Sequence, residues 1–336
     1  LISRIMKKNI SEITLPGNGT KRVLKSVVLQ SPLAGVTDQI FRKLVRRWAP
    51  ESLLFTEMVN ARSLELGYGR NKVEELSKEK GPIGVQLFDF RLQSMIDAAK
   101  KAEDSGAFLI DINMGCPVKK IAKKGGGSAL LKNWNLAAEL VSEVSNAVKI
   151  PVTVKTRLGW CEKSSDPVSL GLLLQDAGAQ LLTLHGRTRK QGFAGKSNWI
   201  AIAEVKKALV IPVIANGDIK NSNDAINCLK ISNADGLMIG RGSLGSPWLV
   251  GQINSFLEGQ EPIKDPDPKT RLNIALEHLQ ELLKAKGDHG LLIARKHLKW
   301  TCTGFSGSSA FANCLVKAKT PHETISLLNQ KINSLK

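Results

Sequence analysis

Short β-rich apolar runs alternate along the chain with segments whose apolar residues recur at helical spacing. A crossover between two parallel strands needs a dozen or more residues, so this alternation predicts parallel pairing. Eight such runs are present, at 26–33, 53–58, 83–87, 108–114, 152–155, 181–185, 213–216 and 236–239. Helical spacing occurs between them, for example at 92–105, 136–148, 169–177 and 200–208. Eight repeats predict a closed (β/α)8 TIM barrel, an α/β fold, whereas six would favour an open doubly wound sheet.

Glycine and proline mark the ends of several of these elements. Gly106 and Gly178 follow predicted helices in the sequences Asp-Ser-Gly-Ala and Asp-Ala-Gly-Ala, where glycine can supply a left-handed cap. Pro151 and Pro212 stand in matching Ile-Pro-Val runs at the entries to the fifth and seventh strands, where a missing N–H group is tolerated. Both signals agree with the predicted alternation.

The pattern changes after Gly259. A linker rich in Pro and Asp occupies 261–268, and only helical spacing follows it, at 270–286, 291–300, 311–318 and 324–335. We therefore expect two domains, a barrel at 1–259 and an all-helical domain at 260–336. The first 25 residues are left unassigned within the barrel portion.

Composition narrows the class of protein. The net charge is +18, from 48 Lys and Arg against 30 Asp and Glu. Such a charge attracts polyanions and indicates nucleic acid as a partner, although a generally basic proteome would also produce it. The 5 cysteines show no Cys-x-x-Cys spacing, which favours a reducing cytoplasm and speaks against disulfides or a zinc site. No apolar run is long enough to span a membrane and no secretory signal is seen, so we expect a cytoplasmic protein. We further expect a monomer that binds no metal.

Polar residues follow the predicted strands at the end where barrels carry their working groups. The strand ends supply Ser31, Gln86, Asn113, Cys116, Lys155, His185, Arg187, Asn216, Asp218 and Arg241. Asn216-Gly217-Asp218 and Gly240-Arg241-Gly242 come after the seventh and eighth strands, the habitual phosphate site of barrels. Their glycines let backbone amides approach an anion, and Arg241 adds a cationic fork. We interpret them together as a phosphate site, while either alone reads equally well as a plain turn.

Lys155 and Cys116 are the candidates for chemistry. Lys155 ends an apolar strand, and it could form a Schiff base, stabilise an anionic ring, or pair with an acid such as Asp111. Cys116 lies between Gly115 and Pro117, a turn that would expose its sulfur at the barrel mouth. An unperturbed thiol is protonated at neutral pH and can donate that proton, although a lone cysteine is more often a small buried residue. His185 is expected to face the same cavity.

Several glycine-rich and basic motifs follow one another along the chain. They are Asn-Met-Gly-Cys-Pro at 113–117 followed by Lys119-Lys120, Lys-Gly-Gly-Gly-Ser-Ala-Leu-Leu at 124–131, Lys-Thr-Arg-Leu-Gly at 155–159, His-Gly-Arg-Thr at 185–188, Ala-Asn-Gly-Asp at 215–218, Gly-Arg-Gly at 240–242 and Ala-Arg-Lys-His at 294–297. In these motifs and their order, the chain from Ser31 to about Trp300 resembles the bacterial type of tRNA dihydrouridine synthase. Leu33 departs from the methionine common in that family, a swap that a backbone role tolerates.

The resemblance implies an enzyme that uses FMN and NADPH to reduce a uridine in tRNA to 5,6-dihydrouridine. Cys116 would protonate position 5 of the uracil, and reduced FMN would deliver hydride to position 6. The residues implied to hold FMN are Pro32, Leu33, Ala34, Gln86, Lys155, His185, Asn216, Gly217, Asp218, Gly240 and Arg241. Those implied to touch the RNA are Asn113, Arg157, Arg187, Arg295 and Lys296. The basic helical domain would grip the tRNA while the base is turned out into the barrel mouth.

Three other functions stay open on the sequence. A flavin barrel acting on a free pyrimidine, similar to dihydroorotate dehydrogenase, would share the strand-end residues but would not need the charge or the helical tail. A non-catalytic RNA-binding barrel would bind no flavin. An aldolase would use Lys155 as a Schiff base.

Overall fold

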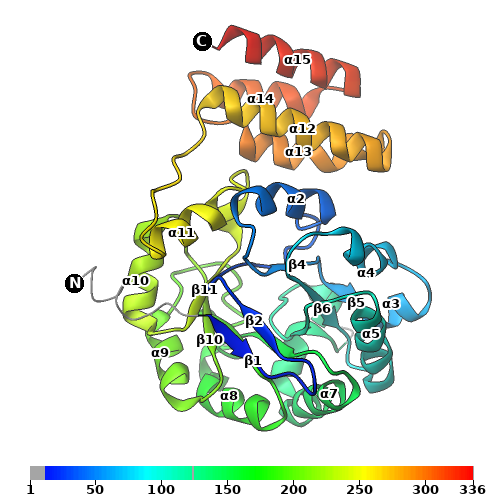
Figure 1. Cartoon of the computed structure of the whole chain (residues 1–336), viewed down its shortest axis with the longest axis vertical. Helices are drawn as coiled ribbons and strands as arrows, with labels where there is room; N and C mark the ends of the chain where they lie inside the picture. Colours follow the sequence, from blue (N-terminus) through cyan, green and yellow to red (C-terminus); the bar gives the residue numbers. More distant parts are fainter. Residues whose placement is uncertain (1–11, 123–124, 336) are drawn as a thin grey trace.

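A computed structural model describes residues 12–122 and 125–335, except for the side chains of Lys119 and Lys120. Its centre is a closed ring of parallel strands (Figure 1). In chain order the strands are β3 (Val28–Gln30), β4 (Leu54–Phe55), β6 (Ile83–Phe88), β7 (Leu109–Asn113), β8 (Val152–Arg157), β9 (Leu182–His185), β10 (Val213–Asn216) and β11 (Gly236–Ile239). The ring closes where the Gln30 N–H group donates to the Leu53 carbonyl at 3.0 Å. The predicted TIM barrel is confirmed.

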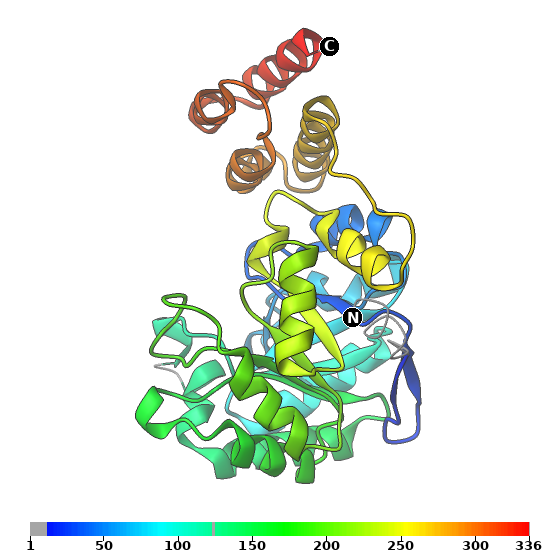
Figure 2. The same ribbon diagram turned by 90° about the vertical axis from the view of Figure 1, so that its left-hand side faces the viewer.

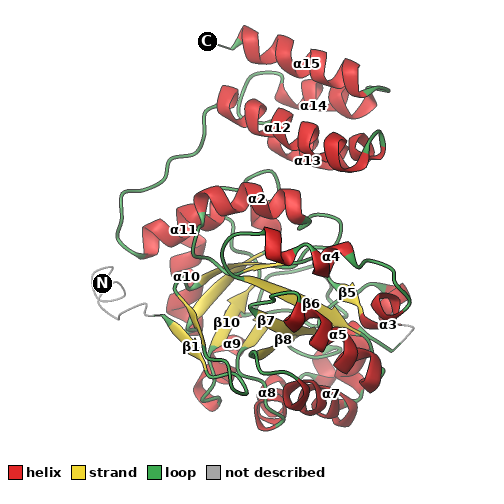
Figure 3. Ribbon diagram, turned by 45° about the vertical axis from the view of Figure 1, so that its right-hand side comes forward, coloured by secondary structure: helices red, strands yellow, loops and turns green. Residues whose placement is uncertain are grey.

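Helices surround the ring and cover its outer face (Figure 3). The longer ones are α2 (Gln39–Trp48), α5 (Leu92–Asp104), α7 (Trp134–Ala147), α8 (Pro167–Asp176), α9 (Trp199–Ala208), α10 (Ser222–Ser232) and α11 (Leu249–Leu257). Asn or Asp side chains cap many of them; Asp166, for example, accepts the Ser169 N–H at the start of α8. The left-handed glycines Gly106 (φ +90°) and Gly178 (φ +105°) end α5 and α8, as predicted.

The strands are buried on both faces, between the helices outside and the packed side chains inside. Every residue of β7, β9, β10 and β11 is buried. The barrel interior carries polar residues as well as apolar ones, among them Gln86, Asp111, Thr153 and Thr183, each at most 1% exposed. Such groups are costly in a core unless they are hydrogen-bonded, so their partners matter for the site.

Two strands differ from the sequence prediction. The first is only three residues long, because the hydroxyl of Ser26 bonds the main chain of Val28 and a turn begins soon after Gln30. The second is divided into β4 and a short β5 (Val59–Asn60), which pairs with the end of β6.

A hairpin that the sequence left unassigned covers the N-terminal end of the barrel. Strands β1 (Ile13–Leu15) and β2 (Arg22–Leu24) pair antiparallel, and Figure 2 shows them at one end of the ring. The N–H groups of Asn18 and Thr20 donate to the Lys149 carbonyl, just before β8. Leu15 of β1 and Leu24 of β2 are buried, so the hairpin packs on this end of the barrel and covers it.

The C-terminal helices form a second apolar core above the barrel (Figures 1 and 2). They are α12 (Pro268–Lys286), α13 (His289–Thr301), α14 (Ser308–Lys317) and α15 (Pro321–Ser334). They dock on α2, where Lys43 pairs with Glu281 at 3.2 Å and Arg47 pairs with Glu277. Of the helices described, none has the length and apolar character to cross a membrane.

Candidate active site

The polar strand ends meet at the C-terminal rim of the barrel. Gln86, Asp111 and Thr153 are register partners on β6, β7 and β8, so their side chains project from the same face of the sheet. One step further along, Asn113 is the register partner of Lys155. The register of the strands therefore brings these side chains together inside the barrel and at its mouth.

Cys116 lies just beyond β7 and is a free, half-buried thiol outside the apolar core. Its carbonyl accepts the Ser128 N–H at 3.2 Å, and a Cβ added at Gly127 would lie 3.3 Å from the Cys116 Cβ. Gly127 therefore lies directly against the cysteine. Burial raises the pKa of the Cys116 thiol, with the positive charges of Arg157 and Lys155 acting against this rise. The thiol is therefore protonated at neutral pH.

A hydrogen-bonded chain of buried side chains supports the turn that carries Cys116. Thr153 Oγ1 donates to Asp111 Oδ1 at 2.7 Å, and Gln86 Nε2 donates to Asp111 Oδ2 at 2.6 Å. Asn113 Nδ2 donates to Gln86 Oε1 at 2.7 Å. Asn113 Oδ1 accepts the N–H group of Cys116 at 3.0 Å. Burial raises the pKa of Asp111 to about 6, while the bonds from Gln86 and Thr153 lower it.

Lys155 is bound by an amide and not by a carboxylate. Its ammonium group donates to Asn216 Oδ1 at 3.0 Å, whereas no ion pair joins it to Asp111, although both side chains are described. Burial, together with repulsion from Arg157, lowers the pKa of Lys155 to about 8. The Asp111 carboxylate favours the ammonium form electrostatically without contacting it, so the charge stays available to an anionic ligand at this point of the rim.

His185 ends β9 and is neutral. Burial, and then the charges of Lys155 and Arg157, lower its pKa to about 2. Its Nε2 lies 3.3 Å from an Arg187 nitrogen, which donates to it. A neutral imidazole in a cationic surrounding can accept or donate one hydrogen bond without adding charge.

The loops after β10 and β11 contain the glycines predicted for phosphate. Gly217 has φ +119°, and a Cβ there would lie 2.9 Å from the His185 ring. At Gly240 a Cβ would find only ordinary contacts, 3.7 Å to Ser31 and 3.9 Å to Asn216. The side chain of Arg241 is 47% exposed beside this loop. These residues leave space and positive charge at one place on the rim.

Asp218 ties this loop to the preceding one. Its carboxylate accepts two bonds from the Arg187 guanidinium, at 2.7 and 2.9 Å, and the Ser197 N–H at 2.8 Å. Although burial raises the pKa of Asp218, the bonds from Arg187 and Ser197 bring it below its usual value. Asp218 also has φ +58°, a left-handed conformation that costs energy for a residue other than glycine.

Two arginines implied as RNA contacts are buried and bind main-chain carbonyls. Arg157 Nε donates to the Gly115 carbonyl at 2.7 Å, and its Nη1 donates to the carbonyls of Thr188 and Gly192. Arg187 also donates to the carbonyls of Ala194 and Gly195. These side chains hold the loops of the rim, and their contact with RNA stays a prediction.

The first strand end and the helical domain meet at the rim. Pro32, Leu33 and Ala34 form the turn after β3, where the Leu33 carbonyl accepts the N–H groups of Val36 and Thr37. A Cβ at Gly35 in this turn would lie 2.9 Å from the ammonium nitrogen of Lys296 on α13. The neighbouring Arg295 instead donates to the Ala318 carbonyl at 3.1 Å, within the helical domain.

Comparison with known proteins agrees with this geometry. The family model for dihydrouridine synthase matches residues 29–336. The chain belongs to the dihydrouridine synthase family. It is 51% identical over 313 residues to "Probable tRNA-dihydrouridine synthase 1" of Synechocystis sp., covering 93% of this chain and 88% of that one.

Two further relatives cover most of both chains. "Probable tRNA-dihydrouridine synthase" of Rickettsia bellii is 40% identical, over 86% of this chain and 89% of its own. "tRNA-dihydrouridine synthase B" of Pasteurella multocida is 36% identical, over 92% and 94%. Among solved structures, morphinone reductase aligns over 76% of this chain and 92% of its own with TM-score 0.49 and 15% identity, which is too distant to bear on function.

Aromatic residues at the rim of this dihydrouridine synthase were not singled out by the sequence. Phe193 is 55% exposed, with the Arg241 guanidinium 4.3 Å from its ring centre. Trp160 lies between two cations, Lys132 at 3.9 Å and Arg189 at 4.4 Å. The available signal was their place in the loops after the fifth and sixth predicted strands, next to basic residues.

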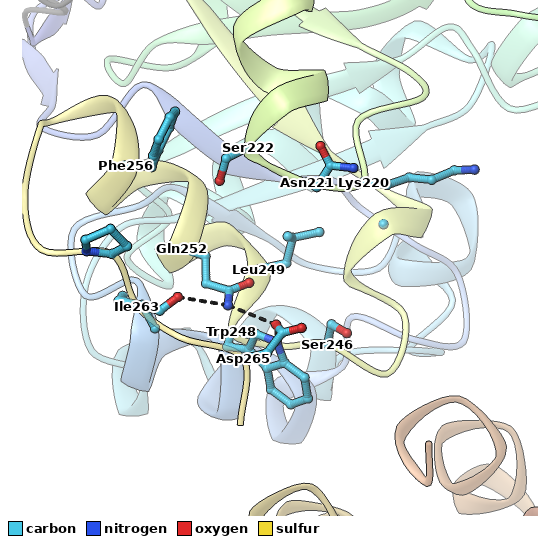
Figure 4. A pocket seen from close by; sticks show the side chains of 12 residues that line it. Lys220, Asn221, Ser222, Ser246, Trp248, Leu249, Gln252, Phe256, Ile263 and Asp265 are labelled. Atoms are coloured by element: carbon cyan, nitrogen blue, oxygen red, sulfur yellow. Dashed lines mark hydrogen bonds between the residues drawn. The ribbon is translucent and has the colours of Figure 1, made fainter. Parts of the chain in front are cut away.

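A pocket of about 220 Å³ lies away from Cys116 and Lys155, between the start of α10, helix α11 and the linker (Figure 4). In it the Gln252 amide donates to the Ile263 carbonyl and to Asp265, both at 3.0 Å. Gly242 is its one residue from the predicted phosphate motifs. The pocket therefore belongs to the attachment of the linker. Lys124, part of one family motif, lies outside the described residues.

Proposed function

We propose that this protein is a tRNA-dihydrouridine synthase that uses FMN and NADPH to reduce a uridine of tRNA. The observation that carries the proposal is a protonated thiol, Cys116, at the same barrel mouth as Lys155, whose ammonium group is bound by the neutral amide of Asn216. Family membership and the names of the relatives support the substrate. The net charge of +18 supports a polyanionic partner.

The described residues fit a flavin. Gly240 leaves space bordered by Ser31 and Asn216, which a larger side chain would narrow. The exposed Arg241 and the backbone at Gly217 provide a place for the phosphate, and Lys155 provides a cation for the polar edge of the ring. We further propose that Pro32, Leu33, Ala34, Gln86, His185 and Asp218 border this cofactor.

Reduced FMN, when bound, supplies the hydride that the reaction adds at position 6 of the uracil. Cys116 holds a proton at Sγ and gives it to position 5, so that the two transfers add two hydrogen atoms to the double bond. Burial raises the pKa of the thiol, which keeps the proton on the sulfur until the carbon takes it. A proton from solvent, by way of the open rim, restores the thiol.

Arg157 keeps the acid in place. Its bond to the Gly115 carbonyl restrains the turn immediately before Cys116. Asn113 restrains the same turn from the other side, through the N–H groups of Gly115 and Cys116. A fixed position for the sulfur is needed because proton transfer to carbon requires close and aligned approach.

Mass spectrometry of tRNA tests the proposal directly. Purified protein, NADPH and tRNA should yield the mass of two added hydrogen atoms at one mapped uridine, and tRNA from cells without the gene should lack it. The purified protein should also absorb as a flavoprotein. Reduction of free uracil or orotate with no change in tRNA would contradict the proposal and favour an enzyme of free pyrimidines.

A further inference from the structure

The hydrogen-bonded chain beneath Cys116 has a direction, which its two ends impose independently. At one end Asp111, when ionised, can only accept hydrogen bonds. Gln86 must therefore turn its NH2 group toward Asp111 and its oxygen toward Asn113. At the other end, the N–H groups of Gly115 and Cys116 can only donate, so Asn113 must turn its oxygen toward them.

The orientations of Gln86 and Asn113 are compatible only because residue 111 is a hydrogen-bond acceptor. If Gln86 were reversed, its NH2 group would face the NH2 group of Asn113. Asn113 would then have to reverse as well, and its NH2 group would face two main-chain donors. Because Asp111 is fully buried, water cannot replace the missing acceptor.

We propose that Asp111 is a positioning residue, which fixes the amide orientations of Gln86 and Asn113 and thereby holds the turn that presents the Cys116 thiol. Thr153 donates to the other oxygen of Asp111 and so restrains the carboxylate. We call the hydrogen-bonded series Asp111–Gln86–Asn113 the relay. The importance of this turn for catalysis rests on the proposed function, whereas the orientation itself does not.

Hydrogen exchange at the far end of the relay tests the proposal on the purified full chain. Asp111→Leu removes the acceptor, so the amides of Gly115 and Cys116 should exchange at least about tenfold faster. Asp111→Asn can still turn its oxygen toward Gln86 and its NH2 group toward Thr153, so it should retain most of the protection. The Met114 amide, which bonds the Lys155 carbonyl, should stay protected in both and serves as an internal reference.

Thr183→Val is the matched control. Thr183 is equally buried on β9, two strands away from Asp111, and its hydroxyl has no hydrogen-bond partner in the described structure. This variant should leave the exchange of Gly115 and Cys116 unchanged. If Asp111→Leu does not fold, Gln86→Leu interrupts the same relay one strand away and carries the same expectation.

Two results would overturn the proposal. One is unchanged protection at Gly115 and Cys116 when the acceptor or Gln86 is removed. The other is an equal loss of protection in Asp111→Asn and Asp111→Leu. The cause would then be the charge of Asp111 and not the hydrogen-bond acceptor that orients the amides. Turnover with tRNA is measured in parallel, and a kcat that falls with an unchanged KM for tRNA should accompany lost protection. If no variant or parent reduces tRNA, the proposed function fails while the exchange result still decides the relay.

Discussion

Lys155 on β8 donates to Asn216 Oδ1 on β10 at 3.0 Å, across the end of the strand that lies between them. Asn216 in turn donates from Nδ2 to the Met238 carbonyl at 2.8 Å, which fixes its oxygen toward the lysine. A neutral acceptor positions the ammonium group without neutralising it. The positive charge of Lys155 is therefore available to an anionic ligand.

Replacing Lys155 should reduce both catalysis and flavin binding. Lys155→Met should lower turnover by about 10²-fold, because a preorganised positive charge is lost from a partly enclosed site. Single-turnover measurement of tRNA reduction checks this. Lys206→Met, on outer helix α9 and paired with Asp235, is the control and should retain full turnover. Unchanged turnover in Lys155→Met would contradict its place at the ring edge.

The affinity for FMN should depend on pH through the same residue. The pKa of Lys155 is lowered to about 8, so the ammonium form predominates below that pH and is lost above it. Affinity for an anionic ligand should therefore fall as pH rises through about 8. Fluorescence titration of FMN from pH 6 to pH 10 measures this, and Lys155→Met should flatten the profile. An equally steep profile in the variant would assign the dependence to another group.

Cys116→Ala should retain FMN but form almost no dihydrouridine. The loss should be about 10²- to 10⁴-fold, the usual contribution of a general acid. Product is quantified by mass spectrometry of digested tRNA. Cys314→Ala, at an exposed position on α14, should be fully active. Full activity without the Cys116 sulfur would remove it from the acid role.

Arg187→Ala should destabilise the fold. Arg187 is 2% exposed, and its loss would remove the donor to the carbonyls of Ala194 and Gly195. It would also leave Asp218 with only the Ser197 N–H and the more distant Arg241 guanidinium among the partners described. The Asp218 side chain is 26% exposed, so the loss should be smaller than the about 3–5 kcal/mol that breaking a fully buried pair costs. Chemical denaturation with purified protein measures it. Arg187→Lys should recover only part of the loss, since an ammonium group cannot form the fork. If stability is unchanged but tRNA affinity falls, Arg187 contacts the RNA instead.

The docking of the helical domain should weaken in acid. His278 and His297 lie against Phe41 of α2, with 4.4 Å between the two imidazole centres. Burial lowers the pKa of His278 to about 4 and that of His297 to about 2, with Glu277 opposing the first shift and Lys296 adding to the second. Below the unperturbed value of about 6.5 the unfolded chain binds more protons, so stability should fall as pH drops toward 4.

Thermal unfolding between pH 7 and pH 4 measures this loss. His278→Phe should make the curve flatter over that range, because one buried titrating ring is replaced by a ring of similar shape. A curve as steep as that of the parent would assign the acid sensitivity to carboxylates elsewhere.

Lys296 and Arg295 should differ in their effects on tRNA binding. Lys296 reaches the turn at Gly35 by the barrel rim, so Lys296→Gln should weaken binding and lower the salt dependence by about 0.7–0.9 of a unit in log–log slope. Arg295→Gln should mainly reduce stability, because Arg295 bonds the Ala318 carbonyl. Affinity measured over a range of salt concentrations separates them. Equal salt slopes for Lys296→Gln and the parent would exclude a phosphate contact.

Much of the fold could be read from local signals. The Ile-Pro-Val entries place the starts of β8 and β10 correctly, at Val152 and Val213. The start of α5 is predicted correctly, whereas α12 begins two residues and α15 three residues before the predicted positions, although the sequence carries the signal. Asp267 and Thr320 cap α12 and α15, and a proline follows each at the first helical position. The hairpin was missed because its strands have three residues each, and its turn is held by the carbonyl of Lys149, which is remote in the sequence.

The site could be predicted only as far as the strand ends. Alternation along a strand shows that Asp111 and Asn113 share a face, and this signal could have identified the relay. It does not show where a long side chain goes. Arg157 and Arg187 turn toward carbonyls of the 188–195 loop, whose position depends on contacts that are remote in the sequence.

The hairpin over the N-terminal end has a consequence for the order of events. Because the hairpin covers that end, the proposed flavin at the rim would be reached from the opposite end of the barrel. The nicotinamide of NADPH and the extruded uracil would then use the same opening, and each would have to leave before the other enters. Such an enzyme should alternate strictly between two half-reactions, one in which NADPH would reduce the flavin and one in which the flavin would reduce the RNA.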